Sequence, residues 1–82
     1  MPSIRWIRHL EVDSEPMTIE IMLGTEHISD KCYVRINSES EMYFRPESET
    51  RQGIISSGIK ILQNHFRGTV VRNLDGSLYQ WN

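Results

Sequence analysis

The sequence predicts one small α+β domain, in which a mostly antiparallel sheet is covered on one face by a single helix. Two patterns and one turn signal predict this fold: alternation with a period of two in residues 4–45, a helical period in residues 47–68, and an Asp75-Gly76 pair after them. The expected order is β-β-β-β-α-β-β. A chain of 82 residues, 38% hydrophobic and 24% charged, fits one globular domain spanning residues 1–82.

Four segments in the first half of the chain alternate as half-buried strands do. The first runs from residue 4 to 12, with Arg8 as the one polar residue on its apolar face, and the second runs from 17 to 23 after Pro16. The third and fourth cover residues 31–37 and 41–45, with a turn at 38–40 and a stop at Pro46. The inward-facing residues of the third and fourth strands are Cys32, Val34, Ile36, Met42 and Phe44.

A helix is predicted between Glu47 and Gly68. Its apolar residues recur at helical spacing, with Ser48 as the expected N-cap and Gly68 as the C-terminal stop. The stripe expected to face the sheet consists of Ile55, Ile59, Leu62 and Phe66, flanked by Ile54 and Ile61. After the helix, Asp75-Gly76 predicts a hairpin of two strands. Whether this hairpin joins the main sheet is left open by the sequence.

Composition narrows the classes of function. The net charge of −2 gives no strong nucleic-acid signal, and no apolar run is long enough to span a bilayer. One cysteine cannot form an internal disulfide, which favours a reducing, cytoplasmic location. Acidic residues are concentrated in residues 11–50, and Ser-Glu alternation at 38–41 and 47–49 indicates either solvated turns or an acidic edge for a basic partner.

The sequence contains no motif for catalysis, for a cofactor or for a metal ion. Cys32 is expected to be a buried, inert thiol, since it shares the apolar face of its strand. His9, His27 and His65 are scattered without the spacing of zinc ligands, and the loop of residues 26–30 offers an incomplete ligand set. We therefore expect no enzyme.

The best candidate site is a cluster of arginine and tyrosine on the third and fourth strands. If the turn pairs Ile36 with Met42, then Arg35 faces Tyr43, and Tyr33 faces Arg45, on the side away from the helix. The predicted partner-binding residues are Arg5, His9, Lys31, Tyr33, Arg35, Tyr43 and Arg45. The alternative interpretation is a set of ordinary cross-strand pairs on a solvated sheet face.

A surface rich in arginine and aromatic residues favours a protein-interaction module that binds and modulates a larger protein or complex. A regulator or inhibitor of this size is of the kind that phages and other mobile elements encode. The alternative is a single-stranded RNA or DNA binder that stacks bases on the tyrosines, and a small enzyme comes third. A homodimer through a sheet edge is a further possibility. A second basic line, formed by Lys60 and Arg67 with Asn64 between them, is expected on the outer side of the helix.

Overall fold

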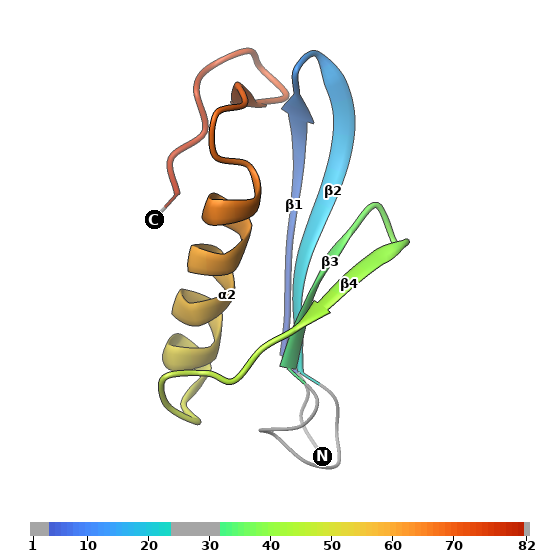
Figure 1. Cartoon of the computed structure of the whole chain (residues 1–82). Coiled ribbons are helices and arrows are strands. Elements are labelled where there is room, and N and C mark those ends of the chain that lie inside the picture. Colours follow the sequence, from blue (N-terminus) through green and yellow to red (C-terminus); the bar gives the residue numbers. More distant parts are fainter. Residues whose placement is uncertain (1–3, 24–31, 82) are drawn as a thin grey trace.

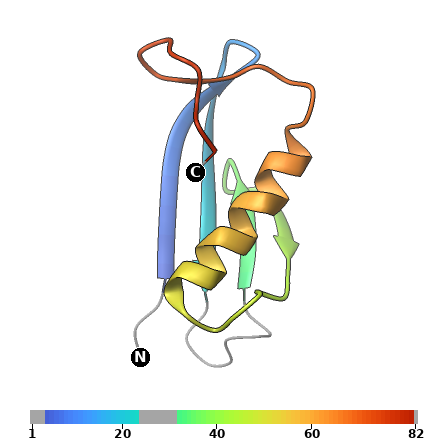
Figure 2. The same cartoon turned by 90° about the vertical axis from the view of Figure 1, so that its left-hand side faces the viewer.

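The computed structural model describes residues 4–23 and 32–81, and confirms an α+β fold with an antiparallel sheet and one helix (Figure 1). Five strands lie in the order β4-β3-β2-β1-β5, and all pairs are antiparallel. The elements are β1 (Ile4–Val12), β2 (Glu15–Leu23), β3 (Cys32–Ile36), β4 (Ser40–Tyr43), α2 (Arg51–His65) and β5 (Val71–Asn73). Helix α2 lies across one face of the sheet, nearest to β3 and β2 (Figure 2).

Strands β1 and β2 form a long hairpin around a two-residue turn. Asp13 and Ser14 have φ angles of 51° and 71°, so both take the left-handed conformation that this tight turn requires. Val12 pairs with Glu15, so β2 begins two residues before the predicted Met17. Pro16 lies within the strand without the loss of a backbone hydrogen bond. Strand β3 pairs with β2 only from Ile19 to Leu23, so no ladder needs an N–H donor at Pro16.

The hairpin of β3 and β4 differs in register from the prediction. Ile36 pairs with Ser40 and not with Met42. Asn37 and Ser38 both have positive φ, and the Glu39 amide donates a 3.0 Å hydrogen bond to the carbonyl of Ile36, which makes the turn tighter than the sequence indicated. A shift of two residues keeps every side chain on its predicted face but changes every cross-strand neighbour.

Helix α2 begins later than predicted and presents a rotated face to the sheet. Its N-cap is Thr50, whose hydroxyl accepts a hydrogen bond from the Gly53 amide, and not Ser48. Its buried residues are Ile54, Ser57, Gly58 and Leu62, whereas Ile55 and Ile59 are only half-buried. The small residues Ser57 and Gly58 explain the rotation, because they let the helix backbone approach β2 more closely than an isoleucine stripe would.

The C-terminal segment joins the main sheet, but only one of its two predicted strands forms. Strand β5 pairs with the end of β1, and the chain then turns at Gly76, which has a φ of 94°. The returning arm makes a single bridge, between Arg72 and Leu78, and the Tyr79 amide donates to the carbonyl of Val71. The predicted sixth strand is therefore wrong as a strand, although the turn itself is confirmed. Gly68, with a φ of 86°, lies just after the helix as predicted.

The core lies between α2 and the sheet. Its members are Trp6, Leu10, Val12, Ile19, Ile21, Leu23, Cys32, Val34, Ile36, Ile54, Leu62, Phe66 and Val71. Most of these side chains are the inward-facing residues of the alternating strands, so the sequence pattern identified which face is buried. Within the described residues, no helix is both long and apolar enough to cross a membrane.

Replacing Gly58 by alanine should destabilise the fold. A Cβ atom at Gly58 would lie 2.7 to 2.8 Å from three side-chain atoms of Ile21, closer than carbon atoms can pack. We expect Gly58→Ala to lower the free energy of unfolding by about 1–3 kcal/mol, even though alanine favours a helix. Urea denaturation followed by circular dichroism measures this. Gln63→Ala, at an exposed position of the same helix, is the control, and an unchanged or higher midpoint for Gly58→Ala would contradict the close contact.

Candidate functional site: the uncovered sheet face

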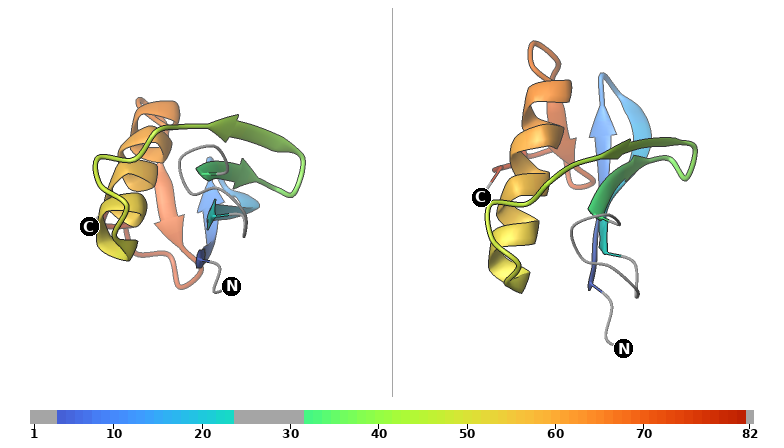
Figure 3. Two further views of the ribbon diagram at one scale, coloured as in Figure 1. Left: turned by 90° about the horizontal axis from the view of Figure 1, so that it is seen from below. Right: turned by 60° about the horizontal axis from the view of Figure 1, so that its bottom comes forward.

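The sheet face opposite α2 is covered by no helix or strand among the described residues (Figure 3). The registers place its side chains in two adjacent rows that cross four strands. One row contains Arg5, Met22, Tyr33 and Tyr43, and the other contains Ile7, Glu20, Arg35 and Glu41. These eight residues are called the open face below.

Two tyrosines form the aromatic part of the open face. Tyr33 and Tyr43 are directly paired on β3 and β4, with ring centroids 5.3 Å apart and planes tilted by 40°. Tyr33 is half-buried, while Tyr43 is 65% exposed. Such a pair stabilises the two strands by ~0.5–1 kcal/mol and still presents most of one ring to solvent.

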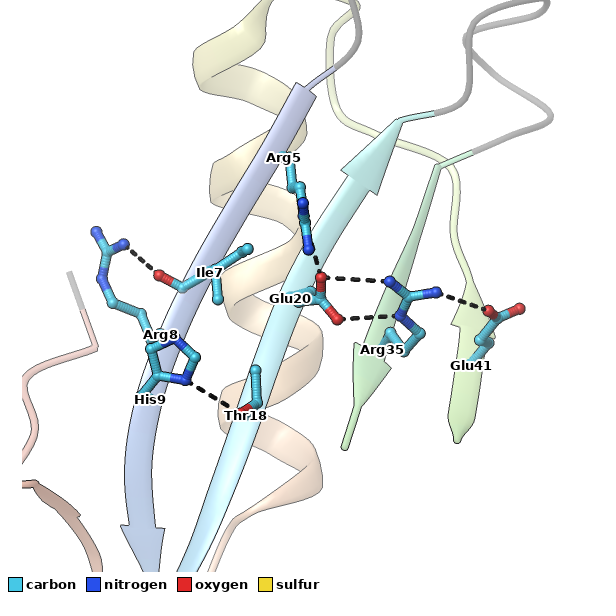
Figure 4. A network of polar contacts seen from close by, with 8 residues as sticks. All are labelled: Arg5, Ile7, Arg8, His9, Thr18, Glu20, Arg35 and Glu41. Carbon is cyan, nitrogen blue, oxygen red and sulfur yellow. Dashed lines mark hydrogen bonds and ion pairs between the residues drawn. The ribbon is translucent and has the colours of Figure 1, made fainter. Parts of the chain in front are cut away.

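A buried carboxylate organises the polar part of the open face. Glu20, in the middle of β2, is only 2% exposed although its strand face is open. Arg35 donates to it through two nitrogens, from Nε to Oε1 at 3.0 Å and from Nη2 to Oε2 at 3.3 Å. Arg5 donates from Nε to Oε2 at 3.3 Å, so two guanidinium groups cover the carboxylate from both sides (Figure 4).

The network extends to the edge strand and fixes the protonation of Glu20. Arg35 Nη1 lies 3.7 Å from Oε2 of Glu41 on β4, so the charged network joins four strands, from Arg5 on β1 to Glu41 on β4. The hydrogen bonds from Arg35 lower the pKa of Glu20, against the opposing effect of burial, and Arg5 adds to the lowering. The carboxylate is thus held in its ionised form, and its charge compensates the arginines.

The observed register changes the predicted arginine–tyrosine pairs. Arg35 faces Glu41 and not Tyr43, while Tyr33 faces Tyr43 and not Arg45. The two reciprocal arginine–tyrosine pairs are therefore wrong, because the tighter turn moves β4 by two residues along β3. Glu20, which lies on the same face, is buried beneath the arginines.

The remaining predicted partner-binding residues are spread over the same side of the sheet or beyond it. His9 is exposed on β1, where its Nδ1 forms a 3.1 Å hydrogen bond with the Thr18 hydroxyl. Arg45 is exposed just after β4. Lys31 lies outside the described residues. The structure therefore brings Arg5, Tyr33, Arg35 and Tyr43 together on one face, with His9 one row further along β1.

Sequence reasoning missed the role of Glu20. It is an acidic residue at the centre of a strand, and both arginines that bind it lie fifteen residues away along the chain. Opposite charges on neighbouring strands are a usable signal only when the pairing of those strands is known. In the folded chain, β1 and β3 both pair with β2, and their registers place Arg5 and Arg35 beside Glu20.

The other candidate chemistries gain no site in the described part of the chain. Cys32 is buried as predicted, and burial raises the pKa of its thiol. Among residues 4–23 and 32–81, no group of three or more histidine, cysteine, aspartate or glutamate residues is placed to hold a metal ion. The loop of residues 26–30, which offered an incomplete ligand set, lies outside the described residues.

Comparison with known proteins adds no assignment. The chain matches no protein-family model, no curated protein sequence and no solved structure. The open face must therefore be interpreted from its own chemistry.

The charge on Glu20 should make stability depend on pH. Because its pKa is lower in the folded than in the unfolded state, ionised Glu20 stabilises the fold above its unfolded pKa of about 4.3. This stabilisation is lost as the pH falls through the lower folded pKa. We expect Glu20→Gln to cost about 1–3 kcal/mol at neutral pH and less in acid. Urea unfolding at a series of pH values measures the difference.

A matched control separates this network from a general loss of charge. Glu39→Gln removes one carboxylate from an exposed turn position and should change the unfolding midpoint little. An equal effect of Glu20→Gln and Glu39→Gln at neutral pH, or a cost of Glu20→Gln that does not shrink in acid, would contradict the stabilising role of Glu20.

Proposed function

We propose that this protein is a non-enzymatic protein-interaction module that uses the open face to bind and modulate a larger protein or complex. The exposed Tyr43 ring, paired with Tyr33 and bordered in its row by Met22 and Arg5, carries this proposal. Tyrosine, methionine and arginine are the residue types enriched where proteins contact one another. A role as a regulator or inhibitor, of the kind that phages encode, belongs to the same proposal.

The Glu20 network supports binding because it orders the surface in advance. Arg35 is only 24% exposed and is held at both Nε and Nη2, so a partner would not have to immobilise it. Ordering a long side chain at an interface costs about 0.5–1.5 kcal/mol, and this cost is already met within the fold. The charged side chains of the open face are thus ordered before a partner binds, and the Tyr43 ring projects beside them.

The charge balance favours a protein partner over a nucleic acid. Within the open face, Arg5 and Arg35 are opposed by Glu20 and Glu41. Binding of single-stranded nucleic acid depends on uncompensated cations beside stacking aromatic rings. The tyrosines offer the stacking surface, but the cations beside them are already paired with carboxylates.

Replacing the exposed Tyr43 should abolish binding of the partner protein. We expect Tyr43→Ala to eliminate a specific set of proteins that co-purify with the tagged wild-type chain, because an aromatic residue at an interface centre typically contributes about 2 kcal/mol or more. Quantitative mass spectrometry of the purified complexes measures the loss. Leu74→Ala is the matched control, since Leu74 is 62% exposed on the turn after β5. Retention of the same proteins by Tyr43→Ala would remove the open face from consideration.

The nucleic-acid alternative has its own test. We expect no binding of labelled single-stranded RNA or DNA by fluorescence anisotropy at physiological salt, because the arginines of the open face are compensated. A nucleic-acid function would appear as an affinity that weakens steeply with added salt and that Tyr43→Ala abolishes. That result would replace the proposed protein partner by a nucleic acid.

A further inference from the structure

Strand β1 has an unpaired edge over most of its length. It pairs with β2 along residues 4–12, but on its other side β5 covers only Leu10 to Val12. Among the described residues, no strand pairs with β1 at positions 4–9 on that side. After Asn73 the chain leaves β1 and enters the turn around Gly76, so the ladder covers only the last three residues of β1.

The backbone groups on this edge belong to Arg5, Ile7 and His9. Val12 and Glu15 close the two-residue turn, so the even residues of β1 bond to β2 and the odd residues point the opposite way. The amide of Asp13, another odd residue, donates to Val70 at 3.0 Å on the β5 side, which agrees with this parity. One of the edge carbonyls, that of Ile7, accepts a 2.8 Å hydrogen bond from Nη1 of Arg8 (Figure 4).

A cavity of about 380 Å³ adjoins this edge on the helix side. Its apolar walls are Trp6 from β1, Ile55 and Ile59 from α2, and Trp81 from the C-terminal segment. Ile55 and Ile59 are the residues that the helical pattern placed at the core, and the rotation of α2 turns them toward this space. Figure 2 shows α2 in front of the sheet, with β1 beside its lower half.

The surroundings of the cavity are basic. A second cavity of about 530 Å³ continues past Trp81 and is lined by Lys60 and Arg67, the basic line of the helix, and by no acidic residue. Arg8 lies over the Trp6 ring, with its guanidinium carbon 4.4 Å from the ring centroid. Lys60 is already paired with Glu47 at 2.6 Å. Arg8, over the Trp6 ring, and Arg67, which lines the second cavity with Trp81, have no carboxylate partner among the described residues.

We propose that β1 and α2 form a binding groove for an extended peptide segment of a partner protein, which adds to the sheet as an antiparallel strand in line with β5. The segment would bond to the backbone of Arg5, Ile7 and His9. An extended peptide gains affinity from such main-chain bonds and specificity from alternate side chains that enter pockets. This surface is distinct from the open face, and the inference goes beyond the proposed function.

The geometry defines the side chains that the segment should carry. The residue opposite Trp6 points to the helix side and enters the cavity, so it should be apolar. The residue opposite Arg8 lies on the same side and should be acidic. In an antiparallel strand the acid comes two positions before the apolar residue, so the recognised pattern is acid-x-apolar.

Arg8 protects the unpaired edge of β1 until the peptide segment binds. Arg8 is exposed, covers the Ile7 carbonyl and stacks on Trp6. These contacts hinder non-specific pairing of this edge with a strand of another chain. An acidic residue of the partner can draw its guanidinium away from the carbonyl. The exchange replaces a hydrogen bond to a neutral carbonyl with an ion pair, so an acidic segment is favoured over a neutral one.

Selection from a library of random displayed peptides, about seven residues long, tests the groove. We expect enrichment of the acid-x-apolar spacing in binders to the wild-type chain. Arg8→Glu should weaken a selected peptide at least ~10-fold and should favour a version with lysine in place of the acid. In the complex, hydrogen exchange at the amides of Arg5, Ile7 and His9 should slow by ~10-fold or more.

Two matched controls make the outcome decisive. Arg45→Glu makes the same charge change beyond β4, at the opposite edge of the sheet, and should leave peptide binding unchanged, as should Tyr43→Ala on the open face. N-methylation of the peptide residue between the acid and the apolar residue removes the donor to the Ile7 carbonyl and should abolish binding. Three results would refute the proposed groove: selected peptides without this spacing, binding that survives N-methylation, or equal losses of affinity with Arg8→Glu and Arg45→Glu. Each of them would leave the open-face proposal unaffected.

Discussion

The contact between Gly58 and Ile21 determines where the helix lies, and much of the molecule follows from it. Without a side chain at Gly58, the backbone of α2 rests directly on the branched side chain of Ile21 in β2. Ser57 and Gly58 form the buried centre of the helix, so its larger apolar residues flank this contact. The helix is thereby fixed over β2 and β3, and the N-terminal half of β1 is left at its margin.

This arrangement divides the sheet into surfaces of different chemistry. On the helix side, the margin between α2 and β1 is apolar, because the half-buried Ile55 and Ile59 and the buried Trp6 line a cavity there. On the opposite side, charges alternate across four strands, and Glu20 is buried without any helix above it. A carboxylate can be buried there because Arg5 and Arg35 supply both its hydrogen bonds and its compensating charge.

The edges of the sheet are protected from pairing with other chains in different ways. The end of β5 is covered by the returning C-terminal arm, through the bridge of Arg72 with Leu78 and the bond from Tyr79. Strand β4 is only four residues long and is followed by Pro46. The unpaired edge of β1 is longer, and Arg8 covers one of its carbonyls, that of Ile7. A guanidinium that can move leaves this edge available to a suitable partner, whereas a covering segment closes an edge permanently.

Five of the six predicted strands, their buried faces and the single helix could be predicted from the order of residues alone, since these features depend on periods of two and 3.6 that a chain carries locally. The positive φ of Gly68 and the turn at Gly76 were likewise readable from residue type. Three features appear only in the folded chain: the pairing of Ile36 with Ser40, the rotation of α2 and the burial of Glu20. Each of these depends on contacts between residues distant along the chain: a turn fixed by the bond from the Asn37 amide to Thr18, a helix seated on Ile21, and a carboxylate reached from two other strands. Local periodicity contains no information about such contacts.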